Sequence, residues 1–207
     1  MIRDQMTTHD KLRHEAAALF AKRGYGGTSM ADIATRVGVR KASLYNYYDS
    51  KADLMLELIE QCLKDWTQSC EIDFSADTSI EDQLAAYLRA ALGFAQDHPQ
   101  AVGVIRLAAG QMPRDLRRRV HAILEFHEVK WRESLTSLFQ EAIERGEVTA
   151  ADPQDLSLFW GVFMDGLIIR QIFAASESKT FVSEVPALWS LFWRGVSGHS
   201  PVKEFVL

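Results

Sequence analysis

The stretch that most limits the fold of this chain is a short apolar helix pattern that ends abruptly at Gly38. The apolar residues before the glycine have spacings of three, one and three, which is one face of an α-helix: Met30, Ile33, Ala34 and Val37. Glycine adopts the left-handed conformation that ends a helix at the least cost. The pattern therefore predicts a helix, a tight turn and a second helix.

Two capping patterns indicate where helices begin on either side of this pair. Ser29 stands three residues before Asp32, and Ser50 stands three residues before Asp53. A serine followed by an acidic residue at this spacing resembles a capping box, which satisfies free N–H groups of the first helical turn. One helix is expected to begin just after Ser29 and another just after Ser50.

The segment between the turn and the second cap has one inward side. Leu44 and Tyr48 are four residues apart and are expected to face the core together. Other faces are left to Arg40, Lys41, Ser43, Tyr45, Asn46 and Tyr47. A helix-turn-helix presents a recognition helix to a DNA groove in this way. The alternative is an ordinary solvated helix face.

The same segment resembles the DNA-binding region of the TetR family of bacterial transcriptional regulators. The resemblance is carried by Gly24, Tyr25, Thr28, Ile33, Ala34, Gly38, Val39, Leu44, Tyr45, Tyr47, Ser50, Lys51 and Leu54. Tyr48 departs from the pattern, because the family usually has Phe there. Asn46 lies at a variable position, so the DNA sequence that is read stays open.

Candidate DNA contacts follow from the residues and from the resemblance. Thr28 and Ser29, at a helix N-terminus, can hold a phosphate, and Lys51 and the hydroxyl of Tyr47 can add to that contact. The residues expected nearest to base edges are Arg40, Lys41, Ala42, Ser43 and Tyr45. Charge agrees with this set. Residues 1–51 carry a net charge of +4 and residues 52–207 carry −9. The positive segment is therefore expected to face the phosphate groups of DNA.

Composition predicts an all-α protein of about nine helices. Strand-like alternation is scarce, and no apolar run is long enough to cross a membrane. The start of the chain lacks an apolar signal segment, so a cytoplasmic location is expected. We expect a three-helix, helix-turn-helix DNA-binding domain at residues 1–50 and a helical ligand-binding and dimerisation domain at residues 51–207.

The last two expected helices are apolar nearly all round, and Pro186 predicts a kink or a late start in the second. One stripe, expected to face its own subunit, consists of Leu156, Phe159, Phe163 and Leu167. The expected dimer interface consists of Trp160, Met164, Ile168, Ile172, Leu188, Trp189, Phe192 and Trp193. It is implausible that both apolar faces of these helices are exposed to solvent. A two-fold homodimer is therefore predicted, as the resemblance also implies. The alternative is an internal core in a monomer.

The resemblance further implies a pocket for a small-molecule effector. The candidate lining residues are Tyr87, Phe94, Ile105, Phe126, Trp131 and Phe163, with Arg106 and Asp165 as polar anchors. Such a pocket favours an apolar or aromatic ligand. The basic run between Arg114 and Arg119 could meet an acyl-CoA phosphate. Each of these residues could instead belong to plain core or to a solvated face.

Together these features predict a regulator, a repressor by resemblance, that binds a pseudo-palindrome in double-stranded DNA and is released by its ligand. The alternative is a DNA-binding protein that recruits a protein partner and has no small ligand. No enzyme or cofactor motif is present, and no metal is expected. His121, Glu125 and Glu128 could share a helix face and hold a metal, but surface polarity explains them as well.

Two cysteines are expected on the helix that begins after Ser50. Cys62 and Cys70 are eight residues apart, and this spacing corresponds to a rise of about 12 Å, which is too far for a disulfide. We expect them to be small buried residues, with redox sensing as the alternative.

Overall fold

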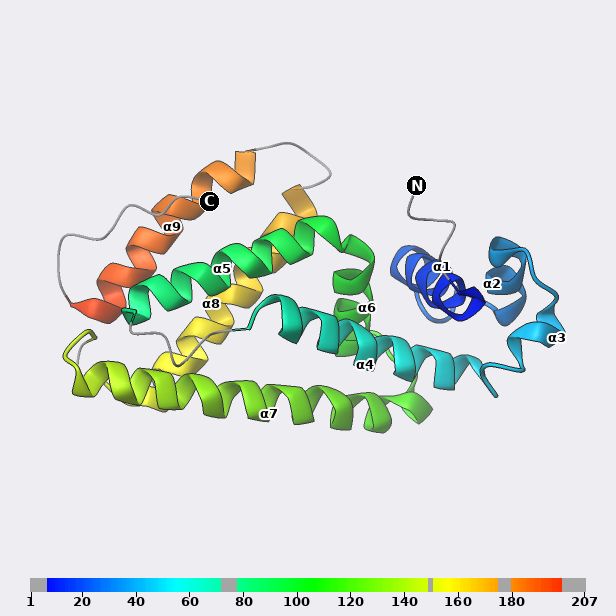
Figure 1. Cartoon of the computed structure of the whole chain (residues 1–207), viewed down its shortest axis with the longest axis horizontal. Helices are drawn as coiled ribbons and strands as arrows, with labels where there is room; N and C mark the ends of the chain where they lie inside the picture. The colour runs from blue at the N-terminus through cyan, green and yellow to red at the C-terminus, as the bar shows by residue number, and fades with distance from the viewer. Residues whose placement is uncertain (1–6, 72–77, 149–150, 175–179, 199–207) are drawn as a thin grey trace. The chain divides into compact units, whose positions relative to one another are not determined.

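The computed structural model describes residues 7–71, 78–148, 151–174 and 180–198, and in these ranges all regular structure is helical (Figure 1). The helices are α1 (Thr8–Arg23), α2 (Met30–Val37), α3 (Lys41–Leu44), α4 (Lys51–Ser69), α5 (Ile80–Asp97), α6 (Pro99–Gly110), α7 (Arg114–Glu144), α8 (Pro153–Ala174) and α9 (Thr180–Ser197). The predicted all-α class is therefore confirmed.

By packing, the chain divides into two compact units. Unit 1 comprises Met1–Asp65 and His98–His127, and unit 2 comprises Trp66–Asp97 and Glu128–Leu207. The predicted boundary between residues 50 and 51 is a functional division, which these packing units do not test. It stays a prediction.

In unit 1, α1 packs against α6 and α2, and α2 packs against α3. Leu12, Ala16 and Phe20 of α1 are fully buried, as their helical spacing predicts. Gly103 of α6 permits a close approach to α1, because a Cβ at this position would lie 2.7 Å from the Cβ of Ala21. This core supports the short helices that carry the candidate DNA contacts.

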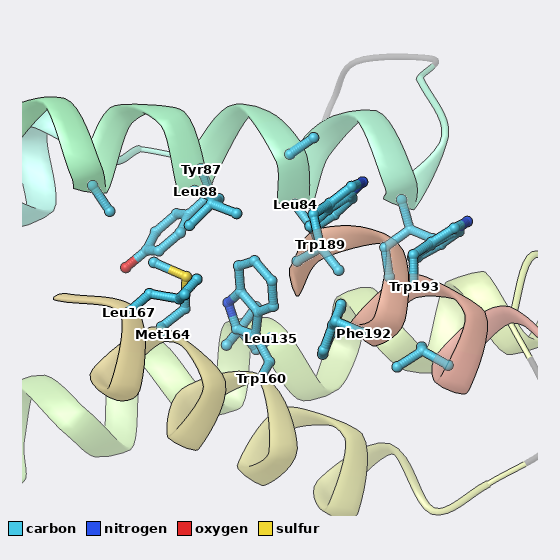
Figure 2. Packing of buried hydrophobic residues seen from close by; sticks show 14 of the residues in the cluster. Leu84, Tyr87, Leu88, Leu135, Trp160, Met164, Leu167, Trp189, Phe192 and Trp193 are labelled. Carbon is cyan, nitrogen blue, oxygen red and sulfur yellow. The ribbon is translucent and has the colours of Figure 1, made fainter. Parts of the chain in front are cut away.

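In unit 2, α5 packs against α8, and α8 packs against α9. Figure 2 shows the centre of this core, where Trp160 points between α5 and α9. The ring centroid of Trp160 lies 6.1 Å from that of Tyr87, 6.3 Å from that of Trp189 and 5.2 Å from that of Phe192. The aromatic side chains of three helices thus form one cluster inside a single subunit.

The predicted dimer interface needs correction, because most of its residues belong to this core. Trp160, Met164, Trp189, Phe192 and Trp193 are buried within the chain. The three other members of the predicted set are partly buried: Ile168, Ile172 and Leu188. The helical pattern showed that α8 has two apolar faces, but the packing of α5 and α9 decided which face is inside.

A different set of large apolar side chains is exposed on α8 and α9. It consists of Leu158, Phe159, Val162 and Ile169 on α8, with Val182 and Leu191 on α9. Phe159 was expected to face its own subunit and is instead about half exposed, although its ring still contacts Phe192 at 5.2 Å. The four α8 residues recur at helical spacing on one side of the helix, and we call them the exposed α8 face.

The boundaries of the other helices follow local signals. Gly146 adopts a φ of 71° after the end of α7. At the start of α5, the backbone N–H of Asp82 donates to Ser79 Oγ at 3.2 Å, which caps the helix. Pro186 lies inside α9, so the expectation of a later start at this proline is wrong. Clustered Asp and Ser residues at positions 71–79 indicate a loop, but most of this segment, residues 72–77, lies outside the described part of the chain.

Both cysteines are buried and free. Burial raises the pKa of the Cys62 thiol to about 12, with a smaller contribution from the charge of Asp65. Burial likewise raises the pKa of the Cys70 thiol to about 12. Because the thiolate is the reactive form, this favours the structural interpretation over redox sensing. Among the described helices, none has the length and apolar character needed to cross a membrane.

Candidate nucleic-acid interface

Both ends of α2 are fixed by local hydrogen bonds. The backbone N–H of Asp32 donates to Ser29 Oγ at 3.1 Å, and the N–H of Ser29 donates back to the Asp32 carboxylate at 2.8 Å. Hydrogen bonds from the Ser29 hydroxyl and from the Ser29 N–H hold the pKa of Asp32 below its usual value. Gly38 adopts a φ of 81°, and its N–H donates to the carbonyl of Ala34 at 3.0 Å. The predicted capping box and glycine turn are confirmed.

The helix after this turn is short, and its inward side is the predicted one. α3 covers only four residues, and the chain continues as a turn in which the N–H of Tyr48 donates to the carbonyl of Leu44 at 3.1 Å. Leu44 and Tyr48 are buried. Their burial orients the remaining side chains of this segment toward solvent.

The outward side of α3 combines basic and aromatic groups. Tyr45 is 44% exposed and Tyr47 is 47% exposed. The ammonium of Lys41 lies 5.8 Å from the centroid of the Tyr45 ring, close enough for a cation–π interaction. The other predicted base-edge candidates are Arg40 and Ala42, which are exposed, and Ser43, which is partly buried. All five base-edge candidates thus belong to one short, solvent-facing segment.

The prediction for Thr28 is wrong with respect to its side chain. Thr28 is only 1% exposed, and its hydroxyl donates to the carbonyl oxygens of Gly24 and Leu19, at 3.0 and 3.3 Å. The hydroxyl therefore ties the end of α1 to the start of α2 and cannot reach a phosphate. The cap of α2 is Ser29, which is exposed and keeps its predicted position at the helix N-terminus.

The side chain of Lys51 also forms more hydrogen bonds within the protein than its position in the sequence indicated. Its ammonium donates to the carbonyl oxygens of Tyr25 and Thr28, at 2.8 and 2.9 Å. An ammonium has three donors, so one N–H is left for a phosphate. The predicted role of Lys51 as a point charge is therefore corrected. Its ammonium mainly stabilises the loop between α1 and α2.

The eight ligand-pocket candidates fall into different units. Ile105, Arg106 and Phe126 belong to unit 1, and the other five are Tyr87, Phe94, Trp131, Phe163 and Asp165 of unit 2. Phe126 is 70% exposed, and Arg106 is exposed as well. These two residues do not line an enclosed site in the described chain, because neither side chain is packed into a core.

Two of the unit 2 candidates, Tyr87 and Trp131, lie close together. Trp66 Nε1 donates to the hydroxyl of Tyr87 at 3.4 Å, and the ring centroid of Trp131 lies 6.2 Å from that of Tyr87. Within the described part of the chain, the indole N–H of Trp160 is buried without a hydrogen-bond partner. Unit 2 therefore holds a buried N–H that could donate to a ligand oxygen.

The acidic candidate of unit 2, Asp165, has a raised pKa. The pKa of Asp165 is raised because loss of hydration disfavours its carboxylate, and the negative charge of Glu128 raises it further. Among the described residues, no group of three or more His, Cys, Asp or Glu side chains could hold a metal ion. The alternative metal site of His121, Glu125 and Glu128 therefore has no support from the geometry.

Comparison with known proteins identifies the part of the chain that carries this interface. Residues 12–58 match the model of the bacterial regulatory proteins of the tetR family. These residues are a TetR-family domain. The chain is 42% identical over 53 residues to the negative transcriptional regulator IcaR of the biofilm operon icaADBC in Staphylococcus epidermidis, covering 26% of this chain and 29% of that protein. It thus matches less than a third of the length of this relative.

Solved structures extend the likeness in fold beyond the TetR-family domain. FadR from Bacillus subtilis, solved with stearoyl-CoA, has a TM-score of 0.74 at 18% identity, covering 90% of this chain and 98% of that one. A TetR-like regulator from Rhodococcus sp. RHA1 also scores 0.74, at 21% identity, with 91% and 94% covered. AibR, in complex with isovaleryl coenzyme A and operator DNA, scores 0.65 at 20% identity, with 84% and 88% covered. The all-helical fold with an N-terminal helix-turn-helix is therefore shared.

Sequence reasoning missed two residues, His9 just before the TetR-family segment and Glu57 inside it. His9 and Glu57 both contact the hydroxyl of Tyr48, at 2.8 and 3.0 Å. Burial and the hydrogen bond to Glu57 raise the pKa of Tyr48. The signal that could have found them is Tyr48 itself, because a buried hydroxyl requires a partner.

Proposed function

We propose that this protein is a DNA-binding transcriptional regulator that contacts operator DNA through α3 and its flanking turns. The observation that carries the proposal is the outward set of Lys41, Tyr45 and Tyr47 around the buried Leu44 and Tyr48, inside a TetR-family domain. A helix-turn-helix places such a segment in the major groove, where a basic side chain bonds guanine and an aromatic ring contacts a thymine methyl group.

Phosphate contacts would position this segment on the duplex. The N-terminus of α2 at Ser29 is exposed, and free N–H groups of a first helical turn attract phosphate oxygens. The remaining N–H of Lys51 and the hydroxyl of Tyr47 are further donors. Arg40, Ala42 and Ser43 complete the proposed contact set, whereas the side chain of Thr28 does not take part.

A homodimer is the second part of the proposal. The exposed α8 face combines four apolar side chains, and apolar patches of this kind are characteristic of interaction sites. A two-fold dimer would cover this face, and two recognition segments would then read a pseudo-palindrome with half-sites about one helical turn apart.

The third part is control by a small apolar ligand in unit 2, which releases DNA. IcaR is named a negative regulator, and the structures of FadR and AibR contain acyl-coenzyme A compounds, which supports repression and a ligand of acyl-CoA type. The aromatic cluster around Tyr87 and the unpaired indole N–H of Trp160 fit an apolar ligand that carries an acceptor oxygen. The ligand can act only through its preference for the state that binds DNA poorly.

The test is selection of duplexes from random-sequence DNA by the full chain. A pseudo-palindromic motif is expected. A variant with Lys41, Tyr45 and Tyr47 replaced by Ala should lose binding to the selected duplex while its circular dichroism spectrum is unchanged. The control replaces Lys64, an exposed lysine of α4, by Ala. The proposal fails if no motif is enriched, or if the triple variant binds as the wild type does.

A second experiment separates ligand control from recruitment of a protein. Acyl-CoA compounds of increasing chain length are added to the protein bound to its selected duplex, and both the melting temperature and the DNA affinity are measured. Ligand control predicts a compound that raises the melting temperature and weakens DNA binding. Stabilisation without any effect on DNA affinity would contradict it and would favour the DNA-binding protein without a small effector.

A further inference from the structure

Three side chains that are far apart in the sequence meet beside the proposed recognition segment. His9 Nε2 of α1 lies 2.8 Å from the hydroxyl oxygen of Tyr48, and that hydroxyl lies 3.0 Å from Glu57 Oε1 of α4. The distance between His9 Nε2 and Glu57 Oε1 is 3.4 Å. The network therefore joins α1, the turn after α3 and α4, all within unit 1.

The direction of the hydrogen bonds follows from the available protons. A carboxylate only accepts, so the single hydroxyl proton of Tyr48 is donated to Glu57. The contact between His9 and Tyr48 must then use a hydrogen on His9 Nε2. The chain of bonds runs from His9 to Tyr48 to Glu57, and each bond polarises the next.

Charged neighbours hold the acceptor end of this chain. Arg13 lies 2.7 Å from Asp10 and 3.8 Å from Glu57, and its guanidinium also reaches the amide oxygen of Gln61 at 3.5 Å. Glu57 is thus placed between the imidazole of His9 and the guanidinium of Arg13. This arrangement fixes the His9 ring from the side that faces α4.

The other side of the His9 ring packs against the recognition segment. Its centroid lies 5.5 Å from that of Tyr48, with the planes nearly parallel at 16°, and 5.7 Å from that of Tyr47 at an angle of 34°. Tyr47 is about half exposed, and among the described residues its ring has one aromatic neighbour, His9. His9 is therefore in a position to restrict the rotamers of Tyr47.

We propose that His9 is a positioning residue for DNA binding, which acts by holding Tyr47 in the rotamer that contacts the duplex. The inference rests on the proposed function, because it assigns a role toward the DNA that Tyr47 would touch. A side chain that is already ordered loses less conformational entropy on binding than one that is free. The hydroxyl of Tyr48 holds His9 in place for this role, since a Phe at that position would leave His9 without its hydroxyl partner.

The test is a double-mutant cycle on affinity for the selected duplex. His9→Ala should weaken binding by about threefold to tenfold, which corresponds to the freedom of one immobilised side chain. In a Tyr47→Ala background the same replacement should have no further effect, because the ring that it positions is absent. His14→Ala, an exposed histidine of the same helix, is the control and should leave affinity unchanged.

A second variant separates positioning from folding. Tyr48→Phe keeps the buried ring and removes the hydroxyl, so it should fold and weaken DNA binding in the same direction as His9→Ala. Its effect should also vanish in the Tyr47→Ala background, whereas melting temperatures should change by the same amount in both backgrounds. An equal loss of affinity with and without Tyr47 would show that His9 and Tyr48 serve stability only, and would overturn the inference.

The two proposals fail in different ways. If the wild-type chain selects no duplex, the proposed function is wrong and the role of His9 falls with it. If the wild type selects a duplex but His9→Ala and Tyr48→Phe bind it as tightly, the proposed function stands and the positioning role is wrong.

Discussion

The ammonium of Lys51 lies 4.0 Å from the centroid of the Tyr25 ring and donates a 2.8 Å hydrogen bond to the carbonyl oxygen of the same residue. A second hydrogen bond, of 2.9 Å, reaches the carbonyl oxygen of Thr28. One charged group at the start of α4 therefore satisfies two carbonyls of the loop between α1 and α2. The orientation of the α2 N-terminus depends on this loop.

Replacement of Lys51 by Met is expected to destabilise the protein and to weaken DNA binding. The two carbonyls would lose a charged donor, and we expect the free energy of unfolding to fall by about 1–3 kcal/mol. Urea unfolding and affinity for the selected duplex measure the two effects. Lys64→Met, in the same helix and exposed, is the control. If Lys51→Met weakens DNA binding without loss of stability, Lys51 acts as a phosphate ligand only.

Replacement of Gly38 by Ala should lower stability through the backbone alone. Gly38 has a φ of 81°, and a Cβ added there would meet nothing within 4 Å. The left-handed conformation costs a residue with a Cβ about 1–2 kcal/mol, and no clash adds to it. Gly26→Ala, which also has open space but no positive φ, should have a much smaller effect. Equal shifts of the unfolding midpoint in the two variants would contradict this explanation.

Trp160 should tolerate Phe far better than Ala. The side chain is fully buried among aromatic rings, so Trp160→Ala leaves a large cavity and is expected to cost about 3–5 kcal/mol. Trp160→Phe keeps part of the packing and removes a buried N–H that has no partner. Calorimetry should therefore show a clearly higher melting temperature for the Phe variant. A Phe variant as unstable as the Ala variant would indicate that the N–H has an unrecognised partner.

The proposed dimer should depend on the exposed α8 face and not on the buried tryptophans. Val162 is 62% exposed, so Val162→Glu is expected to fold normally and to sediment as a 23.4 kDa monomer. Phe126→Glu, at an exposed position of unit 1, is the control and should keep the mass of the wild type. A Val162→Glu variant that stays dimeric would place the interface elsewhere.

Asp165 should make the protein less stable as the pH rises. Desolvation and Glu128 raise its pKa in the folded state, so the carboxylate is disfavoured there relative to the unfolded chain. The penalty is absent below the ordinary aspartate pKa of about 3.9, where both states are protonated, and it is complete above the raised pKa. Asp165→Asn should therefore raise the melting temperature at neutral pH, and the gain should disappear toward about pH 3.

The control for this prediction is Glu133→Gln, an exposed carboxylate of α7 in the same unit. The same pH trend in this variant would attribute the gain to the change in net charge. If the difference in melting temperature between Asp165→Asn and the wild type does not change with pH, Asp165 has the same pKa in the folded and unfolded states.

The sequence by itself determined the helices and their ends. The Ser29 and Ser50 caps, the turn at Gly38 and the inward pair of Leu44 and Tyr48 were predicted correctly, because each depends on residues within four positions of one another. The same local pattern carried the resemblance to the TetR family. Local hydrogen bonds and helical periodicity are therefore sufficient to define the segment proposed to contact DNA.

Only the tertiary structure decided which side of an all-apolar helix is buried and which polar groups are free. Trp160 and Met164 were assigned to a partner and belong to the core, because a helix that is apolar all round gives no sign of where α5 and α9 pack. Thr28 and Lys51 were assigned to phosphate and are bound to backbone carbonyls. Their partners, and the meeting of His9 with Tyr48 and Glu57, depend on contacts between different helices, which periodicity along one helix does not encode.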